Sequence, residues 1–134
     1  MIYSSILGVG HYLPKKILTN EDLSQFVETS DEWIFSRTGI KQRHIAESSE
    51  LTSDLATKAC KNAIENSRID PDKIDYIICA TTTPDQTFPS TASKIQRSLN
   101  IGTIPSFDVQ AVCSGFIYAL QLGDALIKSN NAKN

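Results

Sequence analysis

The stretch from Ile104 to Asn130, IPSFDVQAVCSGFIYALQLGDALIKSN, constrains the fold of this chain more than any other. It opens as a β-type run, IPSFDV, and changes at Cys113 into a helical segment whose apolar residues leave almost no polar face. A helix that is apolar all round is typical of a protein interior. We therefore expect this helix to begin at Cys113 and to be buried at the centre of the fold.

Cys113 stands at the change from strand to helix and is followed by the small residues Ser114 and Gly115. The N-terminus of a helix carries unpaired N–H groups and an effective positive charge, which favour the thiolate form of a cysteine there. Small neighbours also let a substrate backbone approach closely. This pattern alone leaves two interpretations open: Cys113 is a nucleophile, or it is a small buried apolar side chain.

The composition narrows the class of protein. The chain's 134 residues predict one domain, and 40% hydrophobic with 21% charged residues are enough for a core. A net charge of −2 argues against nucleic-acid binding, and no apolar run is long enough to span a membrane. Three cysteines without a CxxC pair, accompanied by only two histidines, lead us to expect no metal site. They fit a reducing compartment, so we expect a cytoplasmic protein.

Alternating strand and helix patterns predict a layered α/β fold. Ile2, Ile6, Leu7 and Val9 are expected to form a first strand, and 52–68 a helix with Cys60 on its core face. The apolar run at 74–81, which contains Cys79, predicts a strand buried on both faces of a parallel sheet. Pro105 indicates that the strand within 103–110 lies at a sheet edge, and dimerisation across it would cover that edge.

The segment TSDEWIFSRTGI at 29–40 predicts a short helix. Thr29 and Glu32 have the spacing of a capping box, and Trp33 and Arg37 lie four residues apart on one helix face. An indole beside a guanidinium can stack a flat ring and pair with a phosphate, or it can form a surface cation–π pair that only packs. Both interpretations stay open at this point. His44, in the short strand that follows, is expected to be structural rather than a base.

The loop TPDQTFPS follows the strand at 74–81 and begins with threonines at its carboxyl end. Ligands of open α/β sheets gather at the carboxyl ends of strands, so this loop is a candidate part of the site. Phe88 is an apolar residue in an otherwise polar loop, which indicates that its ring fills a pocket.

Three motifs together resemble the β-ketoacyl-[acyl carrier protein] synthase III family of the thiolase-like superfamily. They are TSDEWIFSRTGI at 29–40, ATTTPD at 80–85 with FPS at 88–90, and FDVQAVCSGFIYAL at 107–120. Val112 stands where that family more often has alanine. The resemblance implies a thiolase-like layered α/β/α half with a mixed sheet and a buried central helix that starts at the nucleophile Cys113.

The resemblance also implies a role for each site residue. Cys113 matches the nucleophile that takes an acyl group from acyl-CoA, and Trp33 and Arg37 match residues that grip the adenine end of coenzyme A. Thr82 matches the lining of the acyl pocket, and Phe88 matches a residue that reaches into the acyl pocket of the partner subunit in a homodimer. Malonyl-acyl carrier protein would be the second substrate, and no cofactor or metal is implied.

Family members are more than twice as long as this chain, and their second half supplies a histidine and an asparagine that stabilise the decarboxylation carbanion. We therefore expect residues 1–134 to be an N-terminal half-domain, with the C-terminal half absent and no complete condensation by this chain alone. An alternative is a non-enzymatic remnant that only folds or dimerises. Another thiolase-like condensing enzyme is a third reading, against which the motif at 29–40 weighs.

Overall fold

The computed structural model describes residues 3–134, and its backbone forms two compact units. Residues 13–50 make the smaller unit, and the larger one combines the segment before residue 13 with residues 51–134. The division into one half-domain, expected from the sequence, stays a prediction. Among residues 3–134, no helix is long and apolar enough to cross a membrane.

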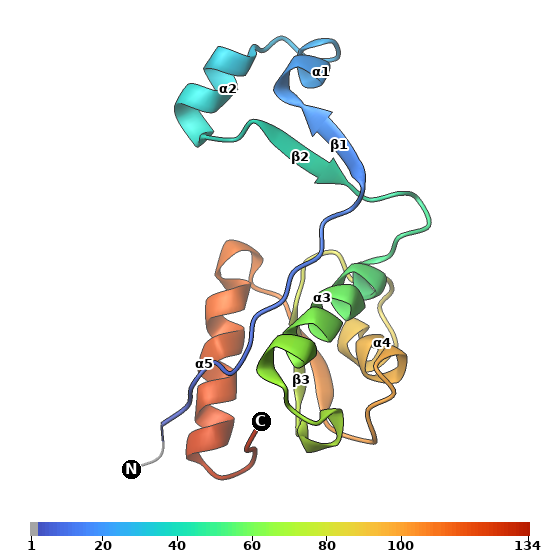
Figure 1. Cartoon of the computed structure of the whole chain (residues 1–134), viewed down its shortest axis with the longest axis vertical. Helices are drawn as coiled ribbons and strands as arrows, with labels where there is room; N and C mark the ends of the chain where they lie inside the picture. The colour runs from blue at the N-terminus through green and yellow to red at the C-terminus, as the bar shows by residue number, and fades with distance from the viewer. Residues whose placement is uncertain (1–2) are drawn as a thin grey trace. The chain divides into compact units, whose positions relative to one another are not determined.

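The smaller unit is built on a two-stranded antiparallel sheet (Figure 1). Its elements in chain order are β1 (Lys16–Thr19), α1 (Asn20–Ser24), α2 (Asp31–Thr38) and β2 (Gln42–Ile45). Asn20 is almost fully buried and its side-chain amide donates to Asp31 and to the carbonyl of Ile40. The carbonyl of the same side chain accepts from the guanidinium of Arg43. One buried polar residue therefore ties α1 to α2 and to β2, and every polar atom of its side chain has a partner.

The larger unit contains a parallel pair of strands with helices on both faces (Figure 1). Its elements are α3 (Thr52–Ser67), the short 3₁₀ helix η1 (Pro71–Lys73), β3 (Ile77–Ala80), α4 (Thr91–Ser98), β4 (Ser106–Val109), the 3₁₀ turn η2 (Val112–Ser114) and α5 (Gly115–Lys128). Ile77 of β3 is opposite Ser106 of β4, and Ala80 is opposite Val109. The predicted α/β/α layering is confirmed in this unit.

The α4 face of this sheet is closed by packing and by hydrogen bonds. Ala92 and Ile95 of α4 are 0% and 2% exposed. The carboxylate of Asp108, in β4, accepts the backbone N–H groups of Thr91 and Ala92 at 2.8 Å each. These N–H groups have no partner inside the helix, so a strand residue supplies the acceptor that the first turn of α4 lacks.

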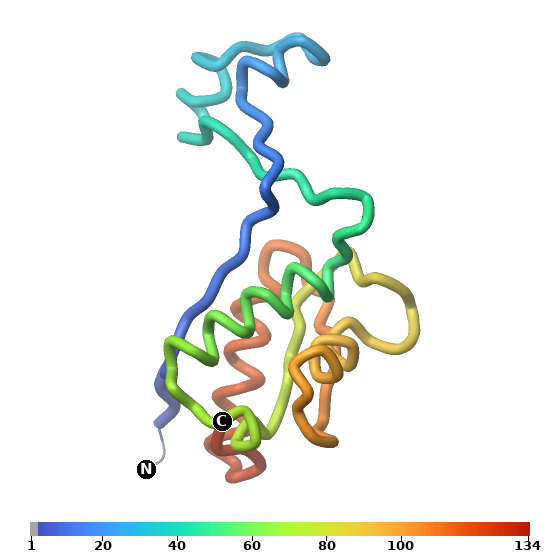
Figure 2. Tube along the Cα trace, turned by 45° about the vertical axis from the view of Figure 1, so that its right-hand side comes forward, coloured from blue at the N-terminus to red at the C-terminus, as the bar shows by residue number. Residues whose placement is uncertain are grey.

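The segment before residue 13 corrects the first sequence expectation, because residues 3–14 form no strand; Ile2 lies outside the described residues. The segment runs along α3, as the tube in Figure 2 makes clear. A Cβ at Gly8 would lie 2.6 Å from the carbonyl oxygen of Ala63, so only glycine permits this approach. The amides of Asn62 and Asn66 donate to the carbonyls of His11 and Val9. Side chains of α3 therefore bind carbonyl groups that a neighbouring strand was expected to bind.

The expected mixed sheet is also wrong for the described residues, which form one antiparallel pair and one separate parallel pair. The strand predicted to be buried on both faces is only half-buried at Ile77, Ile78 and Cys79. Within residues 3–134 the second edge of β3 has no strand partner.

The helix expected to be buried at the centre, α5, is the clearest correction. Phe116 and Ile117 are 65% and 60% exposed, and Tyr118, Leu120 and Leu122 are exposed as well. Within residues 3–134, α5 packs mainly on β3, β4 and η2, and these elements reach only part of its circumference. The apolar composition predicted a helix that needs cover on all sides, and the described residues provide it on one.

Candidate functional site

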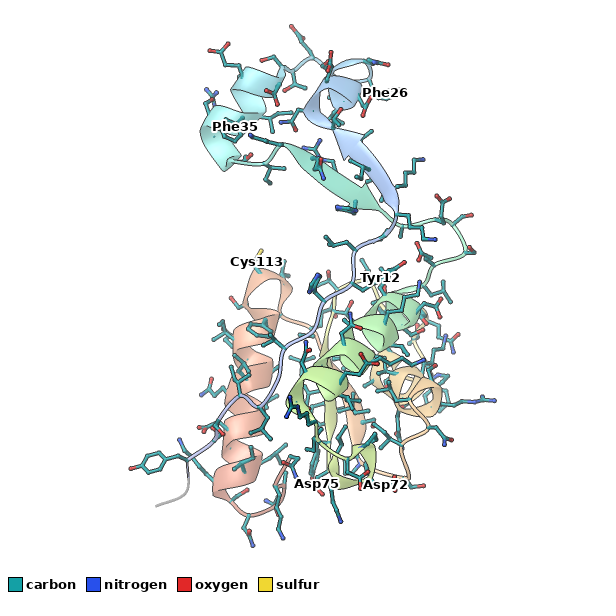
Figure 3. All side chains as sticks on the ribbon, viewed as in Figure 1. Tyr12, Phe26, Phe35, Asp72, Asp75 and Cys113 are labelled. Atoms are coloured by element: carbon teal, nitrogen blue, oxygen red, sulfur yellow. The ribbon has the colours of Figure 1, made fainter. Side chains whose placement is uncertain are left out.

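Cys113 lies in the turn that joins β4 to α5. The chain leaves β4 at Val109, passes through η2 and enters α5 at Gly115, so the α-helix begins two residues later than expected. Within the turn, the N–H of Ser114 donates to the carbonyl of Ala111 at 2.9 Å. The Cys113 side chain is exposed, and Figure 3 shows its sulfur at the tip of the turn. Of the two interpretations left open by the sequence, the buried apolar side chain is excluded in this structure.

The other two cysteines have a different environment. Cys60 in α3 is half-buried, and this burial raises the pKa of its thiol. Burial also raises the pKa of Cys79 to about 11, with a further contribution from the nearby negative charge of Asp108, which is its partner across the β3–β4 pair. Both thiols are therefore held in the unreactive protonated form near neutral pH.

Trp33 and Arg37 meet on one face of α2. The guanidinium carbon of Arg37 lies 4.5 Å from the centroid of the Trp33 ring, and Trp33 is 54% exposed. The helix is capped by Ser30, whose hydroxyl accepts the N–H of Trp33 at 3.1 Å, and not by Thr29 as expected. The capping residue stands one position later, since the helix starts at Asp31. The predicted pairing is confirmed, and the pair belongs to the smaller unit.

The loop from 81 to 90 carries Thr82 and Phe88, both of which are exposed, Phe88 at 87%. Phe88 fills no pocket of the larger unit, so its ring is available to a partner. The loop is fixed by Asp85, a residue to which the sequence reasoning gave no role. A carboxylate in a polar loop between a strand end and a helix start is the signal that could have identified it.

The Asp85 side chain is only 1% exposed. Its carboxylate accepts the N–H and the hydroxyl of Ser53 at 3.0 and 2.6 Å, and the ammonium of Lys94 at 3.1 Å. Burial by itself would raise the pKa of this carboxyl, but the hydrogen bonds from Ser53 and the charge of Lys94 outweigh it and hold the pKa below its usual value. Asp85 therefore joins the loop to the first turn of α3 and to α4 as a charged group.

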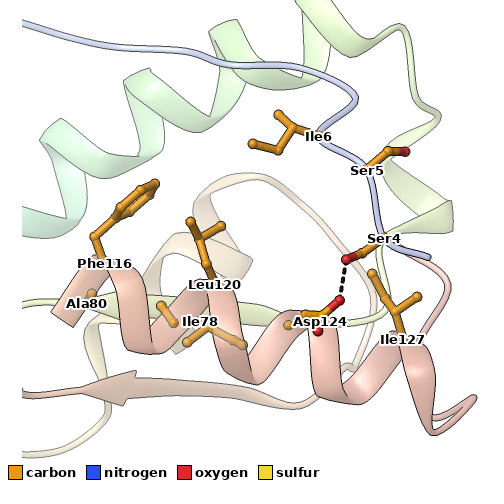
Figure 4. Close-up of a pocket in the computed structure, with 11 residues that line it drawn as sticks. Ser4, Ser5, Ile6, Ile78, Ala80, Phe116, Leu120, Asp124 and Ile127 are labelled. Carbon is orange, nitrogen blue, oxygen red and sulfur yellow. Dashed lines mark hydrogen bonds between the residues drawn. The ribbon is translucent and has the colours of Figure 1, made fainter. Parts of the chain in front are cut away.

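An apolar cavity of about 470 Å³ lies between the N-terminal segment and α5 (Figure 4). Ile78 and Ala80 of β3 form its floor, and Phe116 and Leu120 of α5 line one side. At its far end the hydroxyl of Ser4 donates to Asp124. Because Ile78 and Ala80 face this cavity, the intervening Cys79 points to the opposite face of the sheet, toward α3 and α4.

His44 has its contact partner within the smaller unit. Nδ1 of His44 lies 2.6 Å from the carbonyl oxygen of Pro14 within the smaller unit, which agrees with the structural role expected for it. Within residues 3–134, no group of three or more histidine, cysteine, aspartate or glutamate side chains is arranged to hold a metal ion.

Known proteins match both the sequence and the fold. The family model of 3-oxoacyl-[acyl-carrier-protein (ACP)] synthase III matches residues 107–134, which contain the Cys113 turn and α5. β-Ketoacyl-[acyl-carrier-protein] synthase III of Ehrlichia canis is 58% identical over 97% of this chain and 41% of that protein. The same enzyme of Wolbachia pipientis wMel is 60% identical over 96% of the chain and 40% of its own length. The chain corresponds to the N-terminal part of the β-ketoacyl-[acyl-carrier-protein] synthase III family.

Solved structures of synthase III proteins superpose closely on the backbone of this chain. The crystal structure of 3-oxoacyl-[acyl-carrier-protein] synthase III from Aquifex aeolicus superposes with a TM-score of 0.91 at 51% identity, over 96% of this chain and 41% of that one. The synthase III from Thermus thermophilus gives a TM-score of 0.86 at 41% identity. The chain thus spans about two fifths of the length of the synthase III relatives that it matches.

Proposed function

We propose that this chain carries the acyl-accepting nucleophile of a cytoplasmic β-ketoacyl-[acyl carrier protein] synthase III, an acyltransferase of fatty acid biosynthesis, and that Cys113 is that nucleophile. The observation that supports this most is the contrast among the three thiols. Cys113 is exposed at the end of a strand, whereas burial raises the pKa values of Cys60 and Cys79.

In the proposed first step the Cys113 thiolate attacks the carbonyl carbon of an acyl-CoA thioester. The new C–S bond forms as the bond to coenzyme A breaks, and the departing CoA thiolate takes a proton from water. The backbone N–H of Cys113 supplies one donor for the oxyanion that develops in between. Dividing the reaction through an enzyme-bound thioester replaces one difficult step with two easier ones.

In the proposed second step malonyl-acyl carrier protein loses carbon dioxide, and the resulting carbanion attacks the thioester on Cys113. The bond between the acyl carbon and sulfur breaks, the thiolate returns to Cys113, and a β-ketoacyl carrier protein leaves. The resemblance to the family assigns the stabilisation of that carbanion to side chains beyond the part that matches this chain. We therefore propose that these 134 residues alone reach the thioester stage but do not complete the condensation.

Substrate binding is proposed to involve two exposed groups. The guanidinium of Arg37 lies over the aromatic ring of Trp33. The ring suits stacking on the adenine of coenzyme A, and the cation suits pairing with its phosphate groups. Thr82, in the exposed loop after β3, is proposed to line the acyl pocket.

Phe88 is proposed to enter the acyl pocket of a second copy in a homodimer formed across β4. Its 87% exposure and the unpaired outer edge of β4 within the described residues support this. Sedimentation equilibrium should report a dimer for the wild-type chain and weaker association for Phe88→Ser. A wild-type chain that stays monomeric at high micromolar concentration would remove this part of the proposal.

The test of the nucleophile is acyl transfer from isotopically labelled acetyl-CoA, followed by peptide mapping of the 134-residue chain. Label is expected on the Cys113 peptide and is expected to be lost in Cys113→Ser, with Cys79→Ser as the matched control that keeps it. Label on Cys60 or Cys79 in the folded chain, or none on Cys113, would contradict the proposal. Addition of malonyl-acyl carrier protein to the labelled chain should release carbon dioxide at least about 10²-fold more slowly than a full-length synthase does.

A further inference from the structure

The loop from 81 to 90 has a single buried side chain in its middle part. Residues 82–84 and 86–89 are all exposed, whereas the Asp85 side chain is 1% exposed. Exposed loop residues have little packing to hold them, so the shape of such a loop depends on its polar contacts. Asp85 is therefore the side chain of this exposed part through which the loop is joined to the rest of the larger unit.

The first half of the loop is fixed on α3 and α4. One carboxylate oxygen of Asp85 accepts the N–H of Ser53 at 3.0 Å, and the other accepts the hydroxyl of Ser53 at 2.6 Å and the ammonium of Lys94 at 3.1 Å. Two positions earlier, the carbonyl of Thr83 accepts the hydroxyl of Thr52 at 2.6 Å. Because Thr52 and Ser53 are the first two residues of α3, these bonds tie this half of the loop to the start of one helix.

The second half of the loop ends on α4. Ser90 is the N-cap of α4, and its hydroxyl accepts the N–H of Ser93 at 3.2 Å. Only residues 86–89 lie between this cap and the anchored first half. Within this tip the side-chain amide of Gln86 donates to the carbonyl of Phe88 at 2.7 Å. The Phe88 ring, which is 87% exposed, therefore lies on a short tip whose two ends are both fixed.

We infer that Asp85 is a positioning residue: its buried carboxylate fixes the tip at 86–89 so that the Phe88 ring is held outward, in place for a second copy of the chain. A loop that is ordered before binding loses less conformational entropy when a partner contacts it, so the anchor favours association without touching the partner. A purely structural Asp85 would change the unfolding midpoint with no selective effect on residue 88. The partner contact rests on the proposed function, whereas the fixing of the tip is measured in the monomer.

The first test measures the motion of residue 88 directly. Trp33 is the one tryptophan of the chain, so Trp33→Phe combined with Phe88→Trp places a single indole at the tip. Time-resolved fluorescence anisotropy of the dilute protein, well below its unfolding temperature, then reports nanosecond motion there. Adding Asp85→Asn should at least double the fraction of the anisotropy that decays by local motion. The reason is that an amide nitrogen cannot accept a hydrogen bond from Ser53 or Lys94 as a carboxylate oxygen does.

Two further variants in the same background are the controls. Ser53→Ala removes one donor and keeps the charge pair with Lys94, so it should raise the motion in the same direction but by less. This variant also decides the matter if Asp85→Asn does not fold. Asp124→Asn alters a carboxylate that also binds a lysine and a serine, but on α5, and should leave the motion of residue 88 unchanged. Unchanged motion in both Asp85→Asn and Ser53→Ala, or an equal rise in Asp124→Asn, would overturn the inference.

The second test separates positioning from a general loss of stability. Dissociation constants of the dimer, from sedimentation equilibrium, are compared for Asp85→Asn, Phe88→Ser and the double variant. Asp85→Asn should raise the constant several-fold while Phe88 is present and should add nothing to Phe88→Ser. Equal weakening in both backgrounds would contradict the positioning role. A wild-type chain that forms no dimer would count against the proposed function instead, and the anisotropy of the monomer would still decide whether Asp85 fixes the tip.

Discussion

The two faces of the β3–β4 pair differ in how completely the chain covers them. On the α4 face, Ile95 is 2% exposed, the Asp85 carboxylate has partners on two helices, and both cysteines nearby have raised pKa values. On the α5 face, Phe116 and Ile117 are more than half exposed and Cys113 lies open at the end of the helix. One sheet thus separates a closed structural side from an open side that carries the candidate chemistry.

Apolar composition alone does not show which helix is buried and which is exposed. The helix with the strongest apolar pattern, α5, is the exposed one, and the helix with the best-buried side chains, α4, has a mixed sequence, TASKIQRS. An exposed apolar surface such as that of α5 is typical of a site that contacts another protein segment or a ligand. The relatives are more than twice as long as this chain, and so they have further residues with which such a surface can be covered.

The largest expected effect on stability comes from the closed face. Ile95→Ala should lower the free energy of unfolding by about 3–4 kcal/mol, because it removes buried methyl groups and leaves a cavity beside α4. The measurement is urea denaturation followed by far-UV circular dichroism. Ile117→Ala, at 60% exposure on α5, is the matched control and should leave the midpoint nearly unchanged. Equal losses in the two variants would show that the α4 face is no more tightly packed than the α5 face.

A smaller loss is expected at the loop anchor. Asp85→Asn keeps the shape but removes the charge that Ser53 and Lys94 bind, and it should cost about 2 kcal/mol. Asp124→Asn is the control, since Asp124 also bonds a lysine and a serine but on the exposed side of α5, and no measurable change is expected there. A loss at Asp124 as large as at Asp85 would contradict this prediction.

The same carboxylate predicts a dependence on pH. The pKa of Asp85 in the folded chain is below its usual value, so its contribution is fully present above the ordinary carboxyl range of about pH 4 and disappears as the pH falls through the folded-state pKa. Asp85→Asn should therefore lose less stability than the wild type when the pH is lowered through this range. If the free energy of unfolding fell equally with pH in the two proteins, Asp85 would not be the group responsible.

Much of this organisation could be predicted from the sequence, because its signals are local. The helix at 52–68, the Trp33–Arg37 pair and the change from strand to helix near Cys113 follow from periodicity and capping residues that lie within a few positions of one another. The apolar patterns around Cys60 and Cys79 indicated positions on the core side, and burial is the main cause of their raised pKa values. Three family motifs were sufficient to indicate the family that the comparisons identify.

The other features of the fold and of the site depend on contacts between residues that are distant in the sequence. Local sequence patterns do not report such contacts. Whether Ile6 and Val9 pair with a strand depends on the neighbouring edge, and here the asparagines of α3 bind the carbonyls of this segment instead. The exposure of α5 depends on what lies against it, which no pattern within the helix reports. The partners of Asp85 come from residues 32 positions before it and nine after it.

The most direct test of the account is the order in which the three cysteines of the folded chain react with iodoacetamide near pH 8. With a pKa of about 11, only about one thousandth of Cys79 is thiolate at that pH, and the burial that raises the pKa of Cys60 also slows its reaction. We expect Cys113 to be alkylated first and to completion before label appears at the other two cysteines. Unfolding in urea should make the three rates similar. Labelling of Cys60 or Cys79 as fast as Cys113 in the folded chain would contradict this expectation, because the open face would then hold no distinct thiol.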